Sequence, residues 1–127
     1  MAIVGHGVDL VEVARIERML GEQGERFLQR CFTHGERAYA DTSSKRRAEH
    51  LAARFAAKEA ALKALGTGWS EGIGWTDIEV ARDEAGCPSL VVTGRAGEIA
   101  ARQGVLTWHV SLSHTETHAM ASVIAES

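Results

Sequence analysis

Residues 51–66 show the clearest helical pattern of hydrophobic and polar positions in the chain. At about 100° per residue, one arc of this helix is apolar and contains Leu51, Phe55, Leu62 and Leu65. Lys58 and Glu59 project into the same arc. Because an unpaired buried charge is costly, such groups are normally held by a partner, a metal or a ligand. The pattern therefore predicts a helix that lines a site as well as the core.

Residues 105–113 show the other clear pattern, an alternation of apolar and polar side chains. Trp108, Val110 and Leu112 fall on one face, and Thr107, His109, Ser111 and Ser113 fall on the other. This is the period of a half-buried strand. Its returning strand is expected at residues 119–124, and further strands are expected at 2–8, 75–80 and 90–93, with a turn at 83–88 between the last two.

Capping signals divide the N-terminal half into short helices. Asp9 followed by Glu12 has the pattern of a capping box and predicts a helix that runs to about Leu20. Thr33 and Glu36 repeat the pattern. The first helix is expected to stop at Gly21 and Gly24, and further helices are expected at 25–31, 37–41 and 95–103. The long helix is expected to begin at Ser43 and Ser44 and to end at Gly66. Residues 66–74 then form a glycine-rich loop that a ligand can approach closely.

These elements predict an α+β fold with helices packed on a small, mostly antiparallel sheet. The length of 127 residues, with 45% hydrophobic composition, suits one domain spanning residues 1–127. No apolar run approaches the ~20 residues that cross a bilayer, and the N-terminus lacks a signal-peptide pattern. We therefore expect a soluble cytoplasmic protein. Cys31 and Cys87 are expected to be reduced, although a single bridge between them stays open.

The charge is distributed unevenly along the chain. Residues 15–63 hold eleven of the fourteen Lys and Arg and seven acids, a net charge of +4, whereas the remainder carries −7. A locally basic surface on an acidic protein favours an anionic small ligand or an acidic protein partner over nucleic acid. The alternative is that these charges only solvate helix faces.

Asp9 and Glu59 are the first pair of residues with candidate chemistry. Hard cations such as Mg²⁺ are bound by one or two carboxylates together with water and phosphate oxygens. Two structural alternatives stay open, because Asp9 also fits a helix N-cap and Glu59 also fits an (i, i+4) ion pair with Lys63.

The segment His114–His118 reads HTETH, which is not the HExxH spacing of zinc proteases and is expected at a strand end rather than on a helix. His114 beside Ser113 and Thr115 is instead a candidate phosphate-binding or orienting group. A polar turn is the alternative. The glycines at 66–68 are a weak signal alone, since a glycine commonly caps a helix C-terminus.

Four blocks together resemble one family. They are GVDLVEVARIE, RFAAKEAALKALGTG, WTDIEV followed by a Gly-x-Pro turn, and WHVSLSHT. In this order they resemble the holo-acyl-carrier-protein synthases, the short single-domain 4′-phosphopantetheinyl transferases. The resemblance implies that coenzyme A donates its phosphopantetheine arm to a serine hydroxyl of an acyl carrier protein, with release of adenosine 3′,5′-bisphosphate. It also implies a homotrimer, in which the Asp9 and Glu59 side of one subunit meets the His114 strand end of the next.

The resemblance also implies roles for single residues. Asp9 and Glu59 would bind Mg²⁺, and Glu59, or a metal-bound water, would accept the serine proton. Lys63 would steady the charge on the phosphate oxygens. The implied coenzyme A contacts are Arg54, Lys63, Gly66, Thr67, Gly68, Ser113, His114 and Thr115. The implied docking surface for the acidic carrier is Arg15, Arg18, Met19, Arg26 and Phe27, with Arg46 nearby.

Two residues depart from the family pattern. His6 stands where a small apolar residue is usual, and Cys87 stands where the Gly-x-Pro turn usually holds a lysine or arginine, which puts a contact to the nucleotide 3′-phosphate in doubt at Cys87. Two other functions compete with the transferase. One is a non-catalytic module that binds an acidic protein, and the other is a metal hydrolase that uses the HTETH segment.

Overall fold

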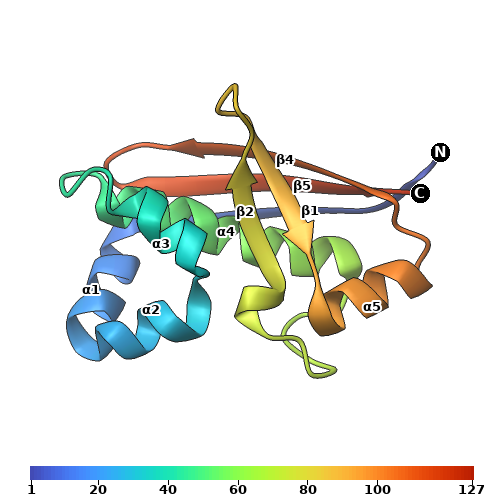
Figure 1. Ribbon diagram of the computed structural model, residues 1–127, viewed down its shortest axis with the longest axis horizontal. Coiled ribbons are helices and arrows are strands. Elements are labelled where there is room, and N and C mark those ends of the chain that lie inside the picture. Colours follow the sequence, from blue (N-terminus) through green and yellow to red (C-terminus); the bar gives the residue numbers. More distant parts are fainter.

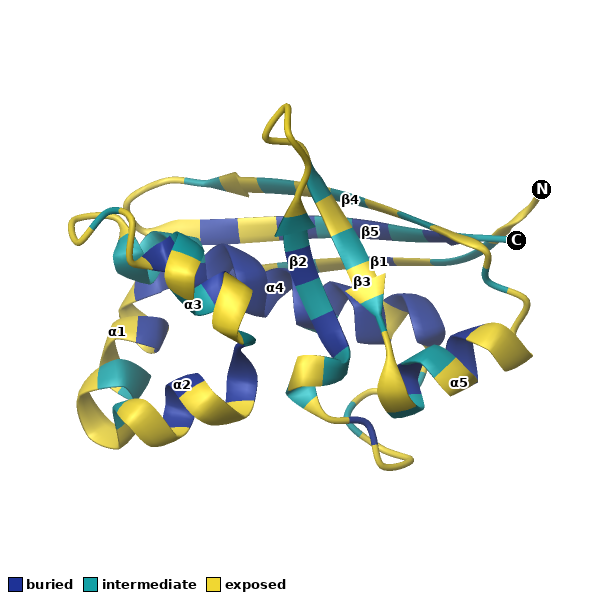
Figure 2. Cartoon of the chain, viewed as in Figure 1, coloured by how far each residue is buried: buried dark blue, intermediate teal, exposed yellow.

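The long helix α4 (Arg47–Leu65) lies at the centre of the computed structural model, which describes residues 1–127 (Figure 1). Alanine at many of its positions keeps the helix narrow, so neighbouring elements pack closely against it. Figure 2 shows that α4 is buried along most of its length. Gly66 ends the helix in the left-handed conformation (φ 76°), as the sequence predicted.

A three-stranded antiparallel sheet covers one side of α4. Its order is β1 (Ile3–Glu12), β5 (His118–Glu126) and β4 (Thr107–His114). Alternate residues of β5, namely Ala119, Ala121, Val123 and Ala125, are buried against the helix. The predicted alternation in β4 is confirmed, with Trp108, Val110 and Leu112 on the less exposed face. A separate hairpin is formed by β2 (Ile78–Arg82) and β3 (Pro88–Val92).

Gly5 and Gly7 allow β1 to lie directly on the backbone of α4. A Cβ atom at Gly7 would lie 1.9 Å from the carbonyl oxygen of Ala60, and one at Gly5 would lie 1.8 Å from that of Ala64. No side chain fits at either position. The sequence therefore brings Asp9, two residues after Gly7, close to the C-terminal half of α4.

The remaining helices lie at the two ends of α4 (Figure 1). They are α1 (Val13–Gln23), α2 (Glu25–Cys31), α3 (His34–Ala40) and α5 (Gly94–Arg102). The prediction of α2 is confirmed at both ends, and the Thr33–Glu36 capping box is formed. No helix in the structure has the length and apolar character needed to cross a membrane.

Several predicted boundaries were wrong. The strand β1 continues through Asp9 to Glu12, and α1 begins at Val13, so Asp9 does not cap a helix. The reason is tertiary, because Asp9 pairs with Ala121 of β5. The helix α4 begins at Arg47, after the turn that follows Ser43 and Ser44. Residues 75–77 form a short 3₁₀ helix, η1 (Trp75–Asp77), and β2 starts only after it.

Lys58 is fully buried and belongs to the core rather than to a ligand site. Its Nζ lies 2.8 Å from Oε1 of Glu36, which is equally buried, and donates hydrogen bonds to the carbonyl oxygens of Trp75 and Ile78. Glu36 also accepts from the backbone N–H groups of Thr33 and Val80. This network joins α3, α4 and β2. One of the two charges on the apolar arc of α4 is thus structural and fully paired.

Candidate functional site

Asp9 and Lys63 form the first contact of the candidate site. Lys63 Nζ donates to Asp9 Oδ1 at 3.1 Å and to the carbonyl oxygen of Val8 at 2.8 Å. The Asp9 side chain is 17% exposed and that of Lys63 is 55% exposed. The pair is therefore open to solvent on the lysine side, where an anionic ligand could reach it.

Glu59 lies one helical turn before Lys63 and is half-buried. Lys63 is engaged with Asp9, so the Glu59–Lys63 ion pair that the spacing allows is not formed. The N-cap alternative for Asp9 also fails, since Asp9 lies inside β1. Both structural alternatives considered from the sequence are therefore absent. We refer to Asp9, Glu59 and Lys63 as the carboxylate cluster.

The donor chemistry of the carboxylate cluster fits a hard divalent cation. Asp9 and Glu59 supply two carboxylates from neighbouring elements, and no group of three or more His, Cys, Asp or Glu side chains is assembled anywhere in the structure. Mg²⁺ is typically bound by one or two carboxylates and completes its shell with water and substrate phosphate oxygens. The cluster thus suits magnesium better than a metal that needs an all-protein cage.

The glycine loop at residues 66–74 follows Lys63 directly. Gly66, Gly68 and Gly72 all have positive φ, which only glycine adopts readily. The loop is held against α4 by aromatic stacking, in which Trp69 stacks on Trp75 (ring centroids 3.8 Å apart) and Trp75 stacks on Phe55 (4.7 Å). Gly66, Thr67 and Gly68 therefore follow Lys63 in a loop that packs against α4.

His114 lies at the other end of α4. Its Nδ1 is 2.9 Å from Oε1 of Glu49, which stands in the first turn of the helix. These two residues line a polar cavity of about 270 Å³, which we call the histidine cavity and which also contains Lys45, Arg46, Thr115 and Glu116. The cavity holds three basic side chains and has no hydrophobic lining residue.

The structure separates other residues that the sequence grouped with His114. Ser113 precedes His114 on β4 and is exposed on the opposite face of the strand, so it does not line the histidine cavity. His118 contacts Thr117 through Nδ1, whereas His114 contacts Glu49, so the two histidines of HTETH have different partners. Arg46, implied as a docking residue, lines the histidine cavity.

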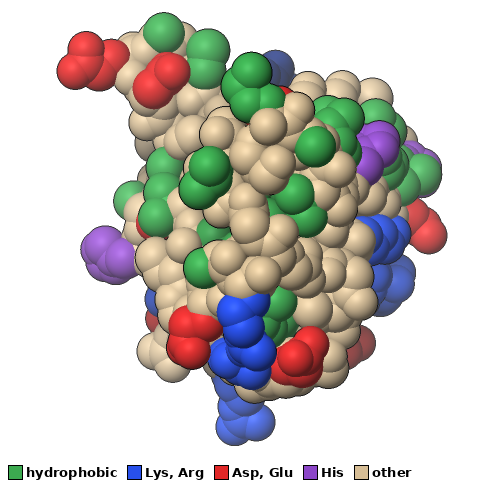
Figure 3. All heavy atoms as spheres, turned by 90° about the vertical axis from the view of Figure 1, so that its right-hand side faces the viewer, with side chains coloured by type: hydrophobic (Ala, Val, Ile, Leu, Met, Phe, Trp, Pro, Cys, Tyr) green, Lys and Arg blue, Asp and Glu red, His purple; other side chains and the backbone are tan.

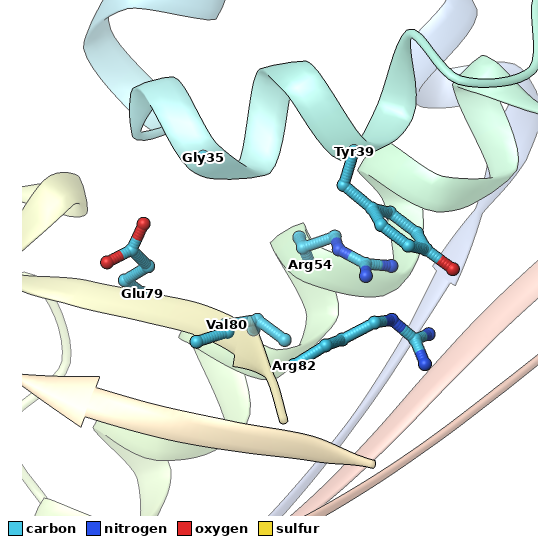
Figure 4. Close-up of a pocket in the computed structure, with 7 residues that line it drawn as sticks. Gly35, Tyr39, Arg54, Glu79, Val80 and Arg82 are labelled. Atoms are coloured by element: carbon cyan, nitrogen blue, oxygen red, sulfur yellow. The ribbon is translucent and has the colours of Figure 1, made fainter. Parts of the chain in front are cut away.

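Arg54 lines a second cavity of about 250 Å³ (Figure 4). The residue is 1% exposed, forms no ion pair, and its Nε has no hydrogen-bonding partner. Its guanidinium lies 4.2 Å from the centre of the Tyr39 ring, and that of Arg82 lies 4.6 Å from the same ring. Burial and the neighbouring Arg82 lower the pKa of Arg54. Neither arginine forms an ion pair, and the one acid that lines the cavity, Glu79, accepts a hydrogen bond from Thr33, so the two cations could bind an anion.

The predicted docking residues divide between surface and core. Arg15, Arg18 and Arg26 are exposed, and Met19 is half-buried. Phe27 is fully buried and packs edge-on against Phe32 (5.5 Å), so its prediction as an apolar anchor for a carrier was wrong. Tertiary packing decides which side of a short helix faces inward, and the sequence of α2 alone does not show it.

Arg15, one of the predicted docking residues, lies near the carboxylate cluster. Its guanidinium lies 5.2 Å from the centre of the Phe55 ring. Phe55 stands one turn of α4 before Glu59. A partner bound at Arg15 would therefore lie next to the carboxylate cluster.

The carboxylate cluster and the histidine cavity remain apart within one chain. Glu49 and Glu59 are separated by about 15 Å along α4, from the helical rise of about 1.5 Å per residue. Sequence reasoning also missed Glu49, Tyr39 and Arg82. Their partners lie on distant segments, and no local motif marks them.

Comparison with protein-family models identifies the class of protein. Residues 5–123 match the 4′-phosphopantetheinyl transferase superfamily. The match covers all four of the blocks singled out in the sequence. The chain belongs to this superfamily and is a transferase.

Relatives narrow the class to the holo-[acyl-carrier-protein] synthases. The chain is 48% identical over 124 residues to the holo-[acyl-carrier-protein] synthase of Koribacter versatilis, with 98% of each chain covered. It is 50% identical over 117 residues to that of Gloeobacter violaceus, with 92% of this chain and 88% of the relative covered. The predicted resemblance is confirmed.

Solved structures of the same enzyme share the fold. The synthase from Neisseria meningitidis superimposes with a TM-score of 0.88 at 33% identity, covering 98% of this chain and 99% of that chain. The synthase from Bacillus anthracis, solved in complex with CoA (3′,5′-ADP), gives a TM-score of 0.82 at 38% identity and covers 100% and 99%. The predicted α+β architecture is thereby confirmed.

Proposed function

We propose that this chain transfers the 4′-phosphopantetheine arm of coenzyme A to a serine hydroxyl of an apo-acyl carrier protein and releases adenosine 3′,5′-bisphosphate. The observation that carries the proposal is the carboxylate cluster, in which β1 and α4 bring Asp9 and Lys63 within 3.1 Å and leave Glu59 one turn away without that lysine as a partner. The relative from Bacillus anthracis, whose complex contains CoA (3′,5′-ADP), supports the choice of co-substrate.

The chemical obstacle is a neutral hydroxyl that attacks a negatively charged pyrophosphate. Catalysis must therefore come from neutralising charge and from positioning. Asp9 and Glu59 would hold Mg²⁺, which supplies positive charge to pyrophosphate oxygens when it is bound. The ion pair between Lys63 and Asp9 weakens when coenzyme A binds, and the ammonium group of Lys63 pairs with the phosphate oxygens. Glu59 accepts the proton of the serine hydroxyl.

Coenzyme A would be held by groups along α4. Of Gly66, Thr67 and Gly68, only Gly68 would offer its backbone N–H, because those of Gly66 and Thr67 already donate to carbonyl oxygens of the last turn of α4. The guanidinium of Arg54, which forms no ion pair and whose Nε has no hydrogen-bonding partner, would offer a buried cation for a phosphate. Ser113 would contact the nucleotide from a neighbouring subunit, since it points away from the histidine cavity of its own chain.

The separation between the carboxylate cluster and the histidine cavity supports assembly into a homotrimer. A second subunit would bring its His114 and Thr115 to the carboxylate cluster of the first. The outer face of the sheet offers a surface for this contact, because Val8, Leu10 and Met120 are exposed on it. Figure 3 views the end of the molecule that carries both termini, where hydrophobic side chains are scattered among polar ones.

The carrier would dock on α1 and α2. Arg15, Arg18 and Arg26 are exposed there, and arginine suits pairing with carboxylates of an acidic helix. Met19, half-buried at the same surface, supplies an apolar neighbour. The location of the protein in the cytoplasm stays a prediction.

Mass spectrometry of the carrier tests the proposed function. The chain is incubated with Mg²⁺, coenzyme A and an apo-carrier, and the carrier is expected to gain the mass of one phosphopantetheine group. The gain should vanish when EDTA is added or coenzyme A is omitted. An unchanged carrier mass, with a carrier that a known transferase does modify, would contradict the proposal.

A further inference from the structure

The contact between His114 and Glu49 fixes the state of the imidazole ring. An ionised carboxylate only accepts hydrogen bonds, so at 2.9 Å the Nδ1 atom of His114 must carry the proton. Both side chains are largely shielded, with exposed fractions of 28% for His114 and 16% for Glu49. The ring is therefore held in one orientation, and Nε2 is the nitrogen left for a ligand.

A second histidine packs against this pair. The ring of His50 lies edge-on to that of His114, with centroids 5.6 Å apart, and its Nδ1 is buried without a hydrogen-bonding partner. Burial, and after it the charges of Arg54, His114 and Arg82, lower the pKa of His50, whereas Glu49 raises it by a smaller effect. Of the two neighbouring rings, His114 alone is hydrogen-bonded to a carboxylate.

The surroundings of His114 are suited to an anion. Lys45 and Arg46 line the same cavity, and Glu116 is the other acid there. Glu49 is occupied by His114, and an anionic oxygen that enters the cavity would meet the two cations and Nε2 of the ring. A protonated ring would donate a charge-assisted hydrogen bond from Nε2 to that oxygen.

We propose that Glu49 is a positioning residue, which accepts the Nδ1–H of His114 and so orients the ring that, when protonated, donates its Nε2–H to a phosphate oxygen of coenzyme A. The inference rests on the proposed function, since coenzyme A is the source of the phosphate. Glu49 itself does not contact the substrate. It acts by orienting the His114 ring, as carboxylates orient histidines at other sites.

The first test reads the ring directly in the free protein. Long-range ¹H–¹⁵N spectra at about pH 8.5, where an ordinary histidine is neutral, show which nitrogen carries the proton. The His114 signals are assigned with the His114→Gln variant. We expect the Nδ1–H form in the wild type and in Glu49→Gln, whose amide oxygen still accepts. We expect the Nε2–H form, usual for a solvated ring, in Glu49→Ala.

Glu116→Ala is the matched control. It removes the same charge from the same cavity, and the Nδ1–H form of His114 should persist. If Glu49→Ala leaves the tautomer unchanged, or if Glu116→Ala shifts it equally, the positioning role is overturned.

The second test measures coenzyme A binding by calorimetry with Mg²⁺ present. Glu49→Ala should weaken binding about tenfold, as expected for one impaired charge-assisted hydrogen bond. If Glu49→Ala does not fold, Glu49→Gln carries the test, because its loss of affinity should disappear when His114→Gln is already present. An equal loss in both backgrounds, or a switched tautomer without any loss, would overturn the proposal. Failure of the transferase function would show separately, as a wild type that modifies no carrier.

Discussion

Lys58 and Glu59 are adjacent on α4, yet the structure treats them in opposite ways. Lys58 is fully buried and has an ion pair with Glu36 and two carbonyl acceptors. Glu59 is half-buried, and the lysine one turn away is paired with Asp9 instead. The difference teaches that a charge on an apolar helix arc has two explanations. A buried charge that is fully paired belongs to the fold, and a half-buried one without an ion-pair partner is a candidate for chemistry.

Glu59→Gln should remove the catalytic function of the half-buried charge without affecting the fold. The change keeps the shape of the side chain and removes the proton acceptor, so turnover should fall about 10²- to 10⁴-fold. The melting temperature should stay close to that of the wild type. The measurement is the rate of carrier modification at saturating substrates. Turnover within a factor of two of the wild type would remove Glu59 from the mechanism.

Lys58→Met should remove the structural role of the buried charge and destabilise the fold. It leaves the carboxylate of Glu36 buried without its cation, and the free energy of unfolding should drop by about 3–5 kcal/mol. Urea denaturation measures this loss. Adding Glu36→Gln to Lys58→Met removes the orphaned charge and should recover part of the stability. A single variant as stable as the wild type would show that the pair is not the structural element described here.

Gly7→Ala should lower both the stability and the turnover, because it displaces the backbone of β1. The new Cβ would meet the carbonyl oxygen of Ala60 at 1.9 Å, so β1 must move away from α4. We expect a loss of about 1–3 kcal/mol of stability together with lower turnover, because Asp9 moves with the strand. Gly21→Ala, where nothing lies within 4 Å, is the control that should have neither effect. Unchanged activity in Gly7→Ala would contradict the positioning of Asp9 by close packing.

Arg15→Glu should separate carrier recognition from coenzyme A binding. The reversed charge repels an acidic carrier, and the KM for the carrier should rise about tenfold at low salt. The KM for coenzyme A should not change. Steady-state kinetics with each substrate varied in turn gives both values. An unchanged carrier KM would show that α1 is not the docking surface.

The smallest expected effect is the contribution of His50 to the pH dependence of the free energy of unfolding. Its pKa is lowered from the ordinary value of 6.5, first by burial and then by the charge of Arg54. The unfolded chain therefore takes up this proton at higher pH than the folded chain does. The free energy of unfolding is unaffected by His50 well above pH 6.5 and falls as the pH drops from there toward the lowered pKa.

Urea denaturation at neutral and mildly acidic pH measures this dependence. His50→Gln should lose less stability on acidification than the wild type. His6→Gln, which changes an exposed histidine, should keep the wild-type dependence. Equal acid sensitivity in His50→Gln and the wild type would contradict the burial effect.

The parts of the fold that the sequence predicted well depend on local interactions. The capping box at Thr33 and Glu36 and the end of α4 at Gly66 are formed by neighbouring residues, and both are confirmed. The extension of β1 past Asp9 depends on pairing with Ala121, more than a hundred residues away along the sequence, so local capping signals misjudged it.

The same distinction applies to the candidate site. Asp9, Glu59 and Lys63 carried a family pattern, and the structure pairs Asp9 with Lys63, one turn of α4 after Glu59. Glu49 carried none, because its relation to His114 exists only after β4 has packed beside the start of α4. The burial of Phe27 against Phe32 is likewise a product of tertiary packing.

A crystal grown with Mn²⁺ and coenzyme A would test the central claim most directly, because manganese replaces magnesium at oxygen sites and gives an anomalous signal. We predict one anomalous peak bound by carboxylate oxygens of both Asp9 and Glu59 and by pyrophosphate oxygens. A peak that contacts only one of these carboxylates, or that lies away from both, would contradict the account.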